Sequence, residues 1–125
     1  MNQLSFENEH SLSSDHSWFL ETELDLIFTR DNGPGYLNYN RIEGSESLNY
    51  QSGTWKVFGT VGLEYYNYLQ ITRASRIIEF SAGIEKQFHD WLYTGFELNR
   101  VDSTSNYSED IYQSNSYLFG INAYF

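Results

Sequence analysis

The side chains of this chain that could do chemistry are mostly carboxylates, and several stand two positions apart. Glu21, Glu23 and Asp25 follow one another in this way within the stretch LETELDLIF (20–28). Two carboxylates can share the work of a glycosidase as acid and base. Residues two apart on a strand, however, share one face and commonly form a polar wall. The spacing therefore favours a wall of carboxylates over a catalytic pair.

The histidines, serines and acidic loops do not assemble into a recognisable reactive site. His10, His16 and His89 are scattered along the chain, and none has a serine in a known nucleophile setting. Cysteine is absent, which excludes disulfides and thiolate chemistry. The stretches DNG (31–33) and SED (108–110) lack a full set of oxygen ligands for a divalent cation. We therefore expect no enzyme activity, no metal site and no cofactor.

Composition limits the class of protein and of partner. The 125 residues suffice for one domain. The net charge of −10 and the pI of about 4.5 make nucleic acid an unfavourable partner. Aromatic residues make up 18 % of a chain whose mean hydropathy is −0.54. A polar chain rich in large amphipathic rings fits a sheet with one wet face and one apolar face.

Apolar and polar residues alternate with a period of two, which predicts β-strands. Five segments alternate strongly and two more weakly, with Glu46 interrupting the apolar positions of one weak segment. We expect about seven strands, no helix, and an antiparallel up-and-down order. The strong segments are 20–28, 55–65, 77–85, 92–99 and 117–125, and the weak ones are 2–9 and 40–51.

The expected connections differ in length at the two ends of such a sheet. Tight turns are predicted at 51–54 and 89–90, and long polar loops at 30–39 and 101–111. Short turns at one end and longer loops at the other are typical of a transmembrane β-barrel.

Strand length and aromatic placement also favour an all-β, antiparallel transmembrane β-barrel. The strands span roughly 9 to 14 residues, whereas strands of soluble domains average about 5 to 6. Tyr and Trp near strand ends suit the membrane–water boundary. The residues expected at that boundary are Trp18, Trp55, Tyr65, Phe88 and Trp91.

The same alternation fits a soluble antiparallel barrel or sandwich that binds a ligand or partner. The two alternatives differ in which face is covered. In the membrane alternative the apolar side chains face lipid, and in the soluble alternative they form the core. The residues that distinguish them are Leu24, Val61, Phe80, Phe96 and Phe119.

The last ten residues, SYLFGINAYF (116–125), resemble the C-terminal strand of Gram-negative outer-membrane β-barrels. That strand ends in Phe, with apolar residues at every second position before it. The resemblance implies the outer membrane as location, its lipid as surroundings, and recognition by the barrel-assembly machinery. The positions that match this assembly signal are Tyr117, Phe119, Ile121, Ala123 and Phe125.

The hairpin from residue 90 to the end is similar to the ends of porin-like barrels associated with exopolysaccharide systems. The similarity lies in Trp91, a Ser-rich loop containing Ser103, and Tyr112 and Asn115 before the final strand. It implies porin-like passive transport or support of export, with polysaccharide or small solutes as partners.

Seven strands are an odd number, whereas single-chain bacterial barrels normally have an even number. We therefore expect residues 1–125 to form one barrel domain or, more simply, the C-terminal portion of a larger one. A missed strand or closure by oligomerisation are the alternatives.

The polar face should then line the barrel interior, where acids would favour cations or neutral solutes over anions. A wall that is merely solvated, or a plugged barrel with a structural or adhesive role, would carry the same residues. The residues expected to line the lumen are Glu21, Glu23, Asp25, Arg41, Lys56, Glu64, Glu79, Glu85, Glu97 and Asn99.

Overall fold

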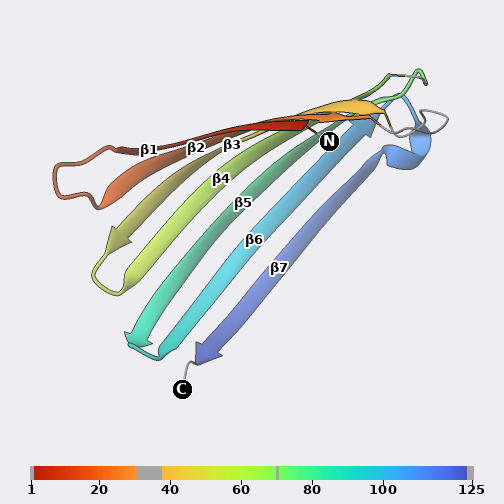
Figure 1. Ribbon diagram of the computed structural model, residues 1–125. Coiled ribbons are helices and arrows are strands. Elements are labelled where there is room, and N and C mark those ends of the chain that lie inside the picture. Colours follow the sequence, from red (N-terminus) through yellow and green to blue (C-terminus); the bar gives the residue numbers. More distant parts are fainter. Residues whose placement is uncertain (1, 31–37, 70, 124–125) are drawn as a thin grey trace.

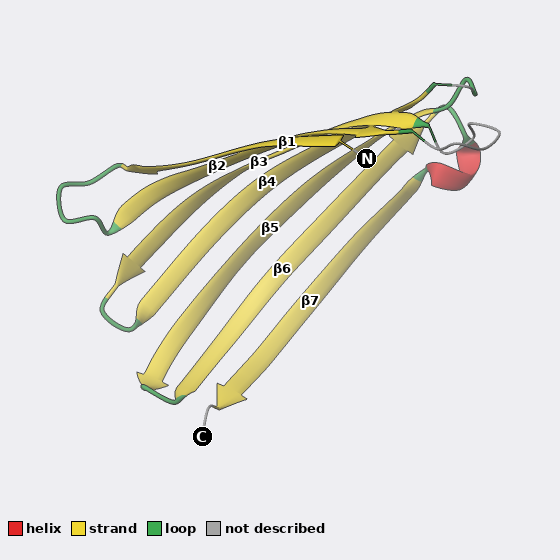
Figure 2. Cartoon of the chain, viewed as in Figure 1, coloured by secondary structure: helices red, strands yellow, loops and turns green. Residues whose placement is uncertain are grey.

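The computed structural model describes residues 2–30, 38–69 and 71–123, which form a single antiparallel sheet (Figure 1). Seven strands follow one another in chain order, each paired with the next (Figure 2). Their bounds are β1 Asn2–Ser11, β2 Trp18–Thr29, β3 Tyr39–Ser52, β4 Trp55–Tyr68, β5 Ala74–His89, β6 Leu92–Ser105 and β7 Tyr112–Ala123.

The predicted all-β class and the up-and-down order of seven strands are confirmed. The sheet twists and curves, but it is open: β1 and β7 are its two edges and do not pair with each other (Figure 1). The described residues therefore do not close into the predicted barrel. The tight turns and the end of β7 lie at one end of the sheet, which we call the short-turn end. The longer connections lie at the opposite, long-loop end.

Two predicted connections were placed wrongly. Half of the expected loop 101–111 continues β6 as far as Ser105, and Ser108–Asp110 forms a turn of 3₁₀-helix where no helix was expected. Asp102 and Thr104 are polar residues at positions where the alternation of β6 would place apolar ones. The alternation therefore ends there, although pairing with β5 continues. The β5–β6 turn lies at Asp90–Trp91, one residue later than predicted, after a register irregularity between Gln87 and His89.

The strand register assigns every side chain to one of two faces. Because directly paired residues share a face, the row Leu24–Gly44–Leu63–Ile78 belongs to one side of the sheet. We call this side the apolar face and the opposite side the polar face. Residues one position away in each strand, such as Glu23 and Glu79, belong to the polar face.

The apolar face is exposed, and the chain has almost no core of its own. Leu24, Val61, Phe80, Phe96 and Phe119 expose between 41 % and 68 % of their surface. Ile27, at 8 %, is the one buried apolar side chain among the described residues, and it lies on the polar face. Within the same part of the chain, no helix is long and apolar enough to cross a membrane.

The β3–β4 hairpin shows how local residues set the register. Ser52 pairs with Trp55, leaving Gly53 and Thr54 as a two-residue loop. Gly53 has φ +57°, the conformation required at the first position of a tight hairpin turn and most accessible to glycine.

A second glycine on the polar face makes room for an aromatic ring. A Cβ added to Gly83 would lie 2.4 Å from Cζ of Phe58, so the ring of Phe58 covers this glycine across the β4–β5 pair. On the apolar face, a Cβ added to Gly59 would meet nothing within 4 Å.

We expect Gly83→Ala to destabilise the fold by about 1–3 kcal/mol, because the Phe58 ring must move from its site. Gly59→Ala serves as the matched control on the neighbouring strand and should change stability little. Urea denaturation followed by tryptophan fluorescence measures both. Equal effects of the two substitutions would show that the Phe58–Gly83 contact contributes nothing specific.

Candidate functional site

All ten residues predicted to line a lumen lie on the polar face. Pairing carries this face across the sheet: Glu23 is opposite Ser45, Ser45 opposite Gly62, and Gly62 opposite Glu79. Asn99 belongs to the adjacent row, and its Nδ2 donates a hydrogen bond of 2.7 Å to Oε1 of Glu79. The period-two alternation therefore grouped these side chains correctly on one surface.

The polar face carries a groove of about 260 Å³ across the middle strands. Five carboxylates from four strands line it, and we call it the acidic groove. The sequence prediction missed one of them, Glu43, although its position next to Ile42 in the alternation marks it as polar-face. Those carboxylates are Glu23, Asp25, Glu43, Glu64 and Glu79.

Arg41 is the cation of the acidic groove. One of its terminal nitrogens lies 2.7 Å from Oε2 of Glu43 and 3.1 Å from Oε1 of Glu64. Its guanidinium also lies 5.2 Å from the centre of the Tyr66 ring. One guanidinium thus forms ion pairs with two carboxylates, and the groove keeps an excess of negative charge.

The other groove carboxylates are held by neutral donors. Ser5 and Gln3 of β1 both donate hydrogen bonds to Asp25. Asn99 does the same for Glu79, and the Ser45 hydroxyl lies 3.4 Å from Glu23. Neutral donors satisfy a carboxylate without cancelling its charge, so the groove keeps its negative potential.

The excess of acid extends over the whole polar face. Among the described strand residues, this face carries ten carboxylates but only two cations, Arg41 and Lys56. Lys56 lies opposite Glu85, with its Nζ 5.9 Å from the centre of the Phe58 ring. The ten carboxylates are Glu7, Glu9, Glu21, Glu23, Asp25, Glu43, Glu64, Glu79, Glu85 and Glu97.

The chemistry available to this surface is attraction of cations and hydrogen bonding to hydroxyl groups. Within the described ranges, no three His, Asp or Glu side chains are grouped so as to hold a metal ion. His16 does meet a serine, with Nδ1 2.9 Å from Oγ of Ser11, but this contact lies in the exposed β1–β2 connection. The neighbouring Asp15 bonds Ser17 instead of the imidazole, so the contact stabilises the turn.

The apolar face is bordered by aromatic and cationic side chains at the short-turn end. Trp18 of β2 and Tyr50 of β3 are in ring contact at 4.7 Å. Lys86 of β5 lies over two rings, with Nζ 4.4 Å from the centre of Trp55 and 5.2 Å from that of Phe88. Trp91 stacks on His89 in the adjacent turn at 5.5 Å. Four of the five residues predicted at a membrane boundary thus lie at one end of the sheet.

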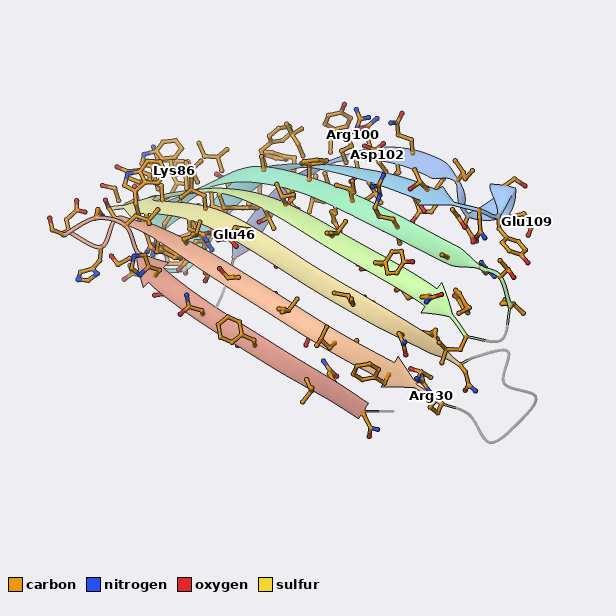
Figure 3. The ribbon with its side chains drawn as sticks, turned by 90° about the horizontal axis from the view of Figure 1, so that it is seen from above. Arg30, Glu46, Lys86, Arg100, Asp102 and Glu109 are labelled. Atoms are coloured by element: carbon orange, nitrogen blue, oxygen red, sulfur yellow. The ribbon has the colours of Figure 1, made fainter. Side chains whose placement is uncertain are left out.

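The opposite border consists of the fifth predicted residue, Tyr65, and of charged side chains. Tyr65 of β4 is paired with Arg76 of β5. On the next strand, β6, Arg100 and Asp102 form an ion pair of 2.9 Å on the same face. Figure 3 shows Lys86 near the short-turn end and Arg100 and Asp102 nearer the long-loop end. We call the surface between these two borders the apolar band.

The apolar band has a constant height on the middle strands. Trp55 and Tyr65 are ten residues apart on β4, as are Arg76 and Lys86 on β5. Glu46 is the one charged side chain inside the band among the described residues. Its carboxylate accepts a hydrogen bond of 3.0 Å from Thr22 on the adjacent strand.

The band runs obliquely to the rows of paired residues. The row from Trp18 reaches Phe96 on β6. The border residue nearest to β6 is Trp91, and the strand begins beside it at Leu92, four residues further toward the turns than Phe96. At about 3.3 Å per residue and about 4.8 Å per strand, four residues over four strand spacings correspond to a strand tilt of about 35°. Ten residues tilted by that angle span about 27 Å.

A network of hydrogen bonds joins two connections at the long-loop end. Arg73 of the β4–β5 connection makes two hydrogen bonds to the Asp110 carboxylate, of 2.8 and 2.5 Å. Its guanidinium also lies over the rings of Tyr68 and Tyr107. Asn106 bonds the backbone of Thr72 and Ala74. These contacts hold the β6–β7 connection, including its 3₁₀ turn, against β5.

We expect this network to open in acid. The hydrogen bond from Arg73 lowers the pKa of Asp110 below its ordinary value of 3.8. A carboxyl whose pKa is lowered on folding stabilises the fold above its ordinary pKa, and that contribution is lost as pH falls through the lowered value. The protection factors of the amides of residues 106–111, which are exchange rates corrected for the intrinsic effect of pH, should therefore fall below about pH 3.8. Asp110→Asn should lower the protection factors at neutral pH and make them less dependent on pH; unchanged protection factors in this variant would contradict the role of Asp110.

Comparison of the chain with protein-family models, with curated protein sequences and with solved structures finds no match.

Proposed function

We propose that this chain forms part of an outer-membrane β-barrel whose polar face borders a water-filled interior. Its activity is porin-like: passive passage of cations or of small neutral solutes along an acidic wall. The apolar band is the observation that carries this proposal. Its estimated tilt of about 35° and height of about 27 Å match transmembrane barrels, in which strands tilt by about 35–45° and the apolar belt is about 25 Å tall.

The borders of the band have the chemistry of the two membrane–water interfaces. Tyr and Trp rings suit the headgroup level because one edge is apolar and the other can hydrogen-bond. Lysine and arginine near the ends of a spanning segment extend their charges toward the headgroups. On β4 and β5, the pairs Trp55–Lys86 and Tyr65–Arg76 supply both features at the two borders.

The exposure of the apolar face supports lipid as its surroundings. Soluble monomers rarely expose a continuous apolar patch larger than a few hundred Å². The apolar face of this chain extends from Leu4 on β1 to Ile121 on β7, both of which are more than half exposed. In a soluble sandwich a second layer would have to cover this face.

The C-terminal strand supports the outer membrane and its assembly machinery as the location and partner. Four of the five matching residues, Tyr117, Phe119, Ile121 and Ala123, alternate on the apolar face of β7. The fifth, Phe125, lies outside the described residues. A role in polysaccharide export rests on the similarity of the hairpin from residue 90 alone.

Reconstitution into liposomes tests the proposal. The purified chain, refolded in detergent and diluted into phosphatidylcholine vesicles, should float with the vesicles in a density gradient and resist extraction by carbonate and urea. A chain that remains soluble and folded without detergent, and that stays at the bottom of the gradient, would favour the soluble alternative.

A further inference from the structure

The two edge strands of the sheet carry apolar side chains that lack a neighbour. Phe119 on β7 exposes 68 % of its surface, whereas Phe80 on the central strand β5 exposes 45 %. Leu4 on β1 exposes 65 %, and Tyr117 on β7 74 %. These residues lie on the same apolar face as their inner counterparts, so the difference arises from the missing strand beside them.

Neither edge strand contains the lysine, proline or bulge that commonly protects a sheet edge from pairing. Soluble proteins protect an edge with lysine, proline, bulges or short strands. The 12 residues of β7, YQSNSYLFGINA, contain no charge and no proline, and their register with β6 has no irregularity. The charges that β1 carries at Glu7 and Glu9 lie on the polar face. Both edges therefore remain available for backbone pairing.

The direction of the strands limits what can pair there. Each strand is antiparallel to the next, so the first and seventh run in the same direction (Figure 1). If β1 and β7 met directly, they would form a parallel pair. A second copy in the same membrane orientation would present its own β1 to β7, and that pair would also be parallel. Antiparallel pairs are more common and somewhat more stable.

We infer that β1 and β7 are joined through an odd number of further strands from outside residues 1–125, the outermost of which run antiparallel to both edges. Such a strand has about the length of β1 and β7, which contain 10 and 12 residues. It presents apolar residues beside Phe119 and Leu4 and polar residues beside Ser116 and Ser5. This inference rests on the proposed function, because lipid does not tolerate an unpaired sheet edge.

Disulfide trapping with a synthetic strand tests the inference. The chain contains no cysteine, so introduced thiols are the only ones present. Ser114→Cys near the start of β7 and Asn122→Cys near its end place matched thiols on the polar face. The probe is a peptide copying β2, WFLETELDLIFT, with a cysteine added at its N-terminus. A peptide of the same composition without alternation is the control.

With an antiparallel partner, the alternating peptide should link to Asn122→Cys several-fold faster than to Ser114→Cys. Moving the cysteine to the place of the peptide's last threonine, which lies on the same face as the N-terminal cysteine, should reverse this preference. The control peptide should link slowly to both. Preference for Ser114→Cys by the N-terminal thiol would overturn the inference, and so would equal rates for the two peptides.

Direct closure is tested in the same way. Gln3→Cys, Ser5→Cys and Glu7→Cys are each combined with Ser116→Cys. Neighbouring strands lie about 4.8 Å apart, within reach of a disulfide, whereas an intervening strand doubles that separation. We expect no β1–β7 disulfide within one chain or between two chains, and finding either would overturn the inference. Vesicle flotation separates the two proposals, because a chain that floats but does not capture the peptide retains the membrane location and loses the strand partner.

Discussion

Val61→Lys is expected to destabilise the fold in a bilayer by about 2–4 kcal/mol, the cost of a cation near the midplane of a barrel's lipid-facing side. Val61 lies on β4 between the two borders of the apolar band and exposes 49 % of its surface. Lipid cannot solvate the added ammonium, and Lys at this depth is far from either interface. Urea titration of the chain in lipid vesicles, followed by tryptophan fluorescence, measures the change.

Thr60→Lys is the matched control, because Thr60 is the adjacent residue of the same strand and lies on the polar face. Its hydroxyl makes a hydrogen bond of 2.8 Å with Ser47, so this substitution loses one neutral contact but places its charge among carboxylates. We expect a loss of no more than about 1 kcal/mol. If Thr60→Lys were the more damaging of the two, the polar face would be the buried one and the orientation of the sheet would be reversed.

Removing three charges from the acidic groove is expected to abolish most of the preference for cations. With the complete barrel to which this chain is proposed to belong reconstituted in a planar bilayer, the unmodified sequence should give a reversal potential of the cation-selective sign in a salt gradient. Glu23→Gln, Glu64→Gln and Glu79→Gln together should shift that potential toward zero, because the wall then attracts cations less. The amides retain most of the volume and the hydrogen-bonding capacity of the side chains.

The control removes the same charge from the connections, by Asp15→Asn, Asp90→Asn and Glu109→Gln. This variant should keep most of the selectivity, since these residues lie outside the strands. Equal effects of the two triple variants would mean that total charge, and not the acidic groove, determines selectivity. An anion-selective unmodified chain would contradict the assignment of the acidic face to the solute path.

The sequence predicted the architecture because each strand repeats a signal of period two. That signal placed Glu23, Glu79 and Asn99 on one surface although they belong to three different strands. It failed where side chains did not follow the pattern. β6 continues through Asp102 and Thr104, which carry polar side chains on the apolar face beyond the band. Backbone pairing with β5, and with β7 as far as Ser103, shows that the strand persists.

Which side chains of the polar face contact one another depends on the register of the strands. Alternation alone does not determine that register. Glu43 is a groove residue because it pairs with both Asp25 and Glu64. Arg41 reaches Glu43 on its own strand and Glu64 on the adjacent strand β4. The contact of Phe58 with Gly83 likewise requires the two residues to be cross-strand partners. Closure depends on which strands lie next to β1 and β7, and alternation within a strand carries no information on this neighbour.

The central claim is that the apolar face meets lipid while the polar face meets water, and a cysteine scan of β4 tests it most directly. Single cysteines at residues 55–65, labelled with an environment-sensitive fluorophore, are reconstituted in vesicles and exposed to a lipid-soluble and a water-soluble quencher. We predict alternation along the strand: Val57, Gly59, Val61 and Leu63 quenched from the lipid, and Phe58, Thr60, Gly62 and Glu64 from water. The opposite alternation, or no lipid quenching at any position, would contradict the account.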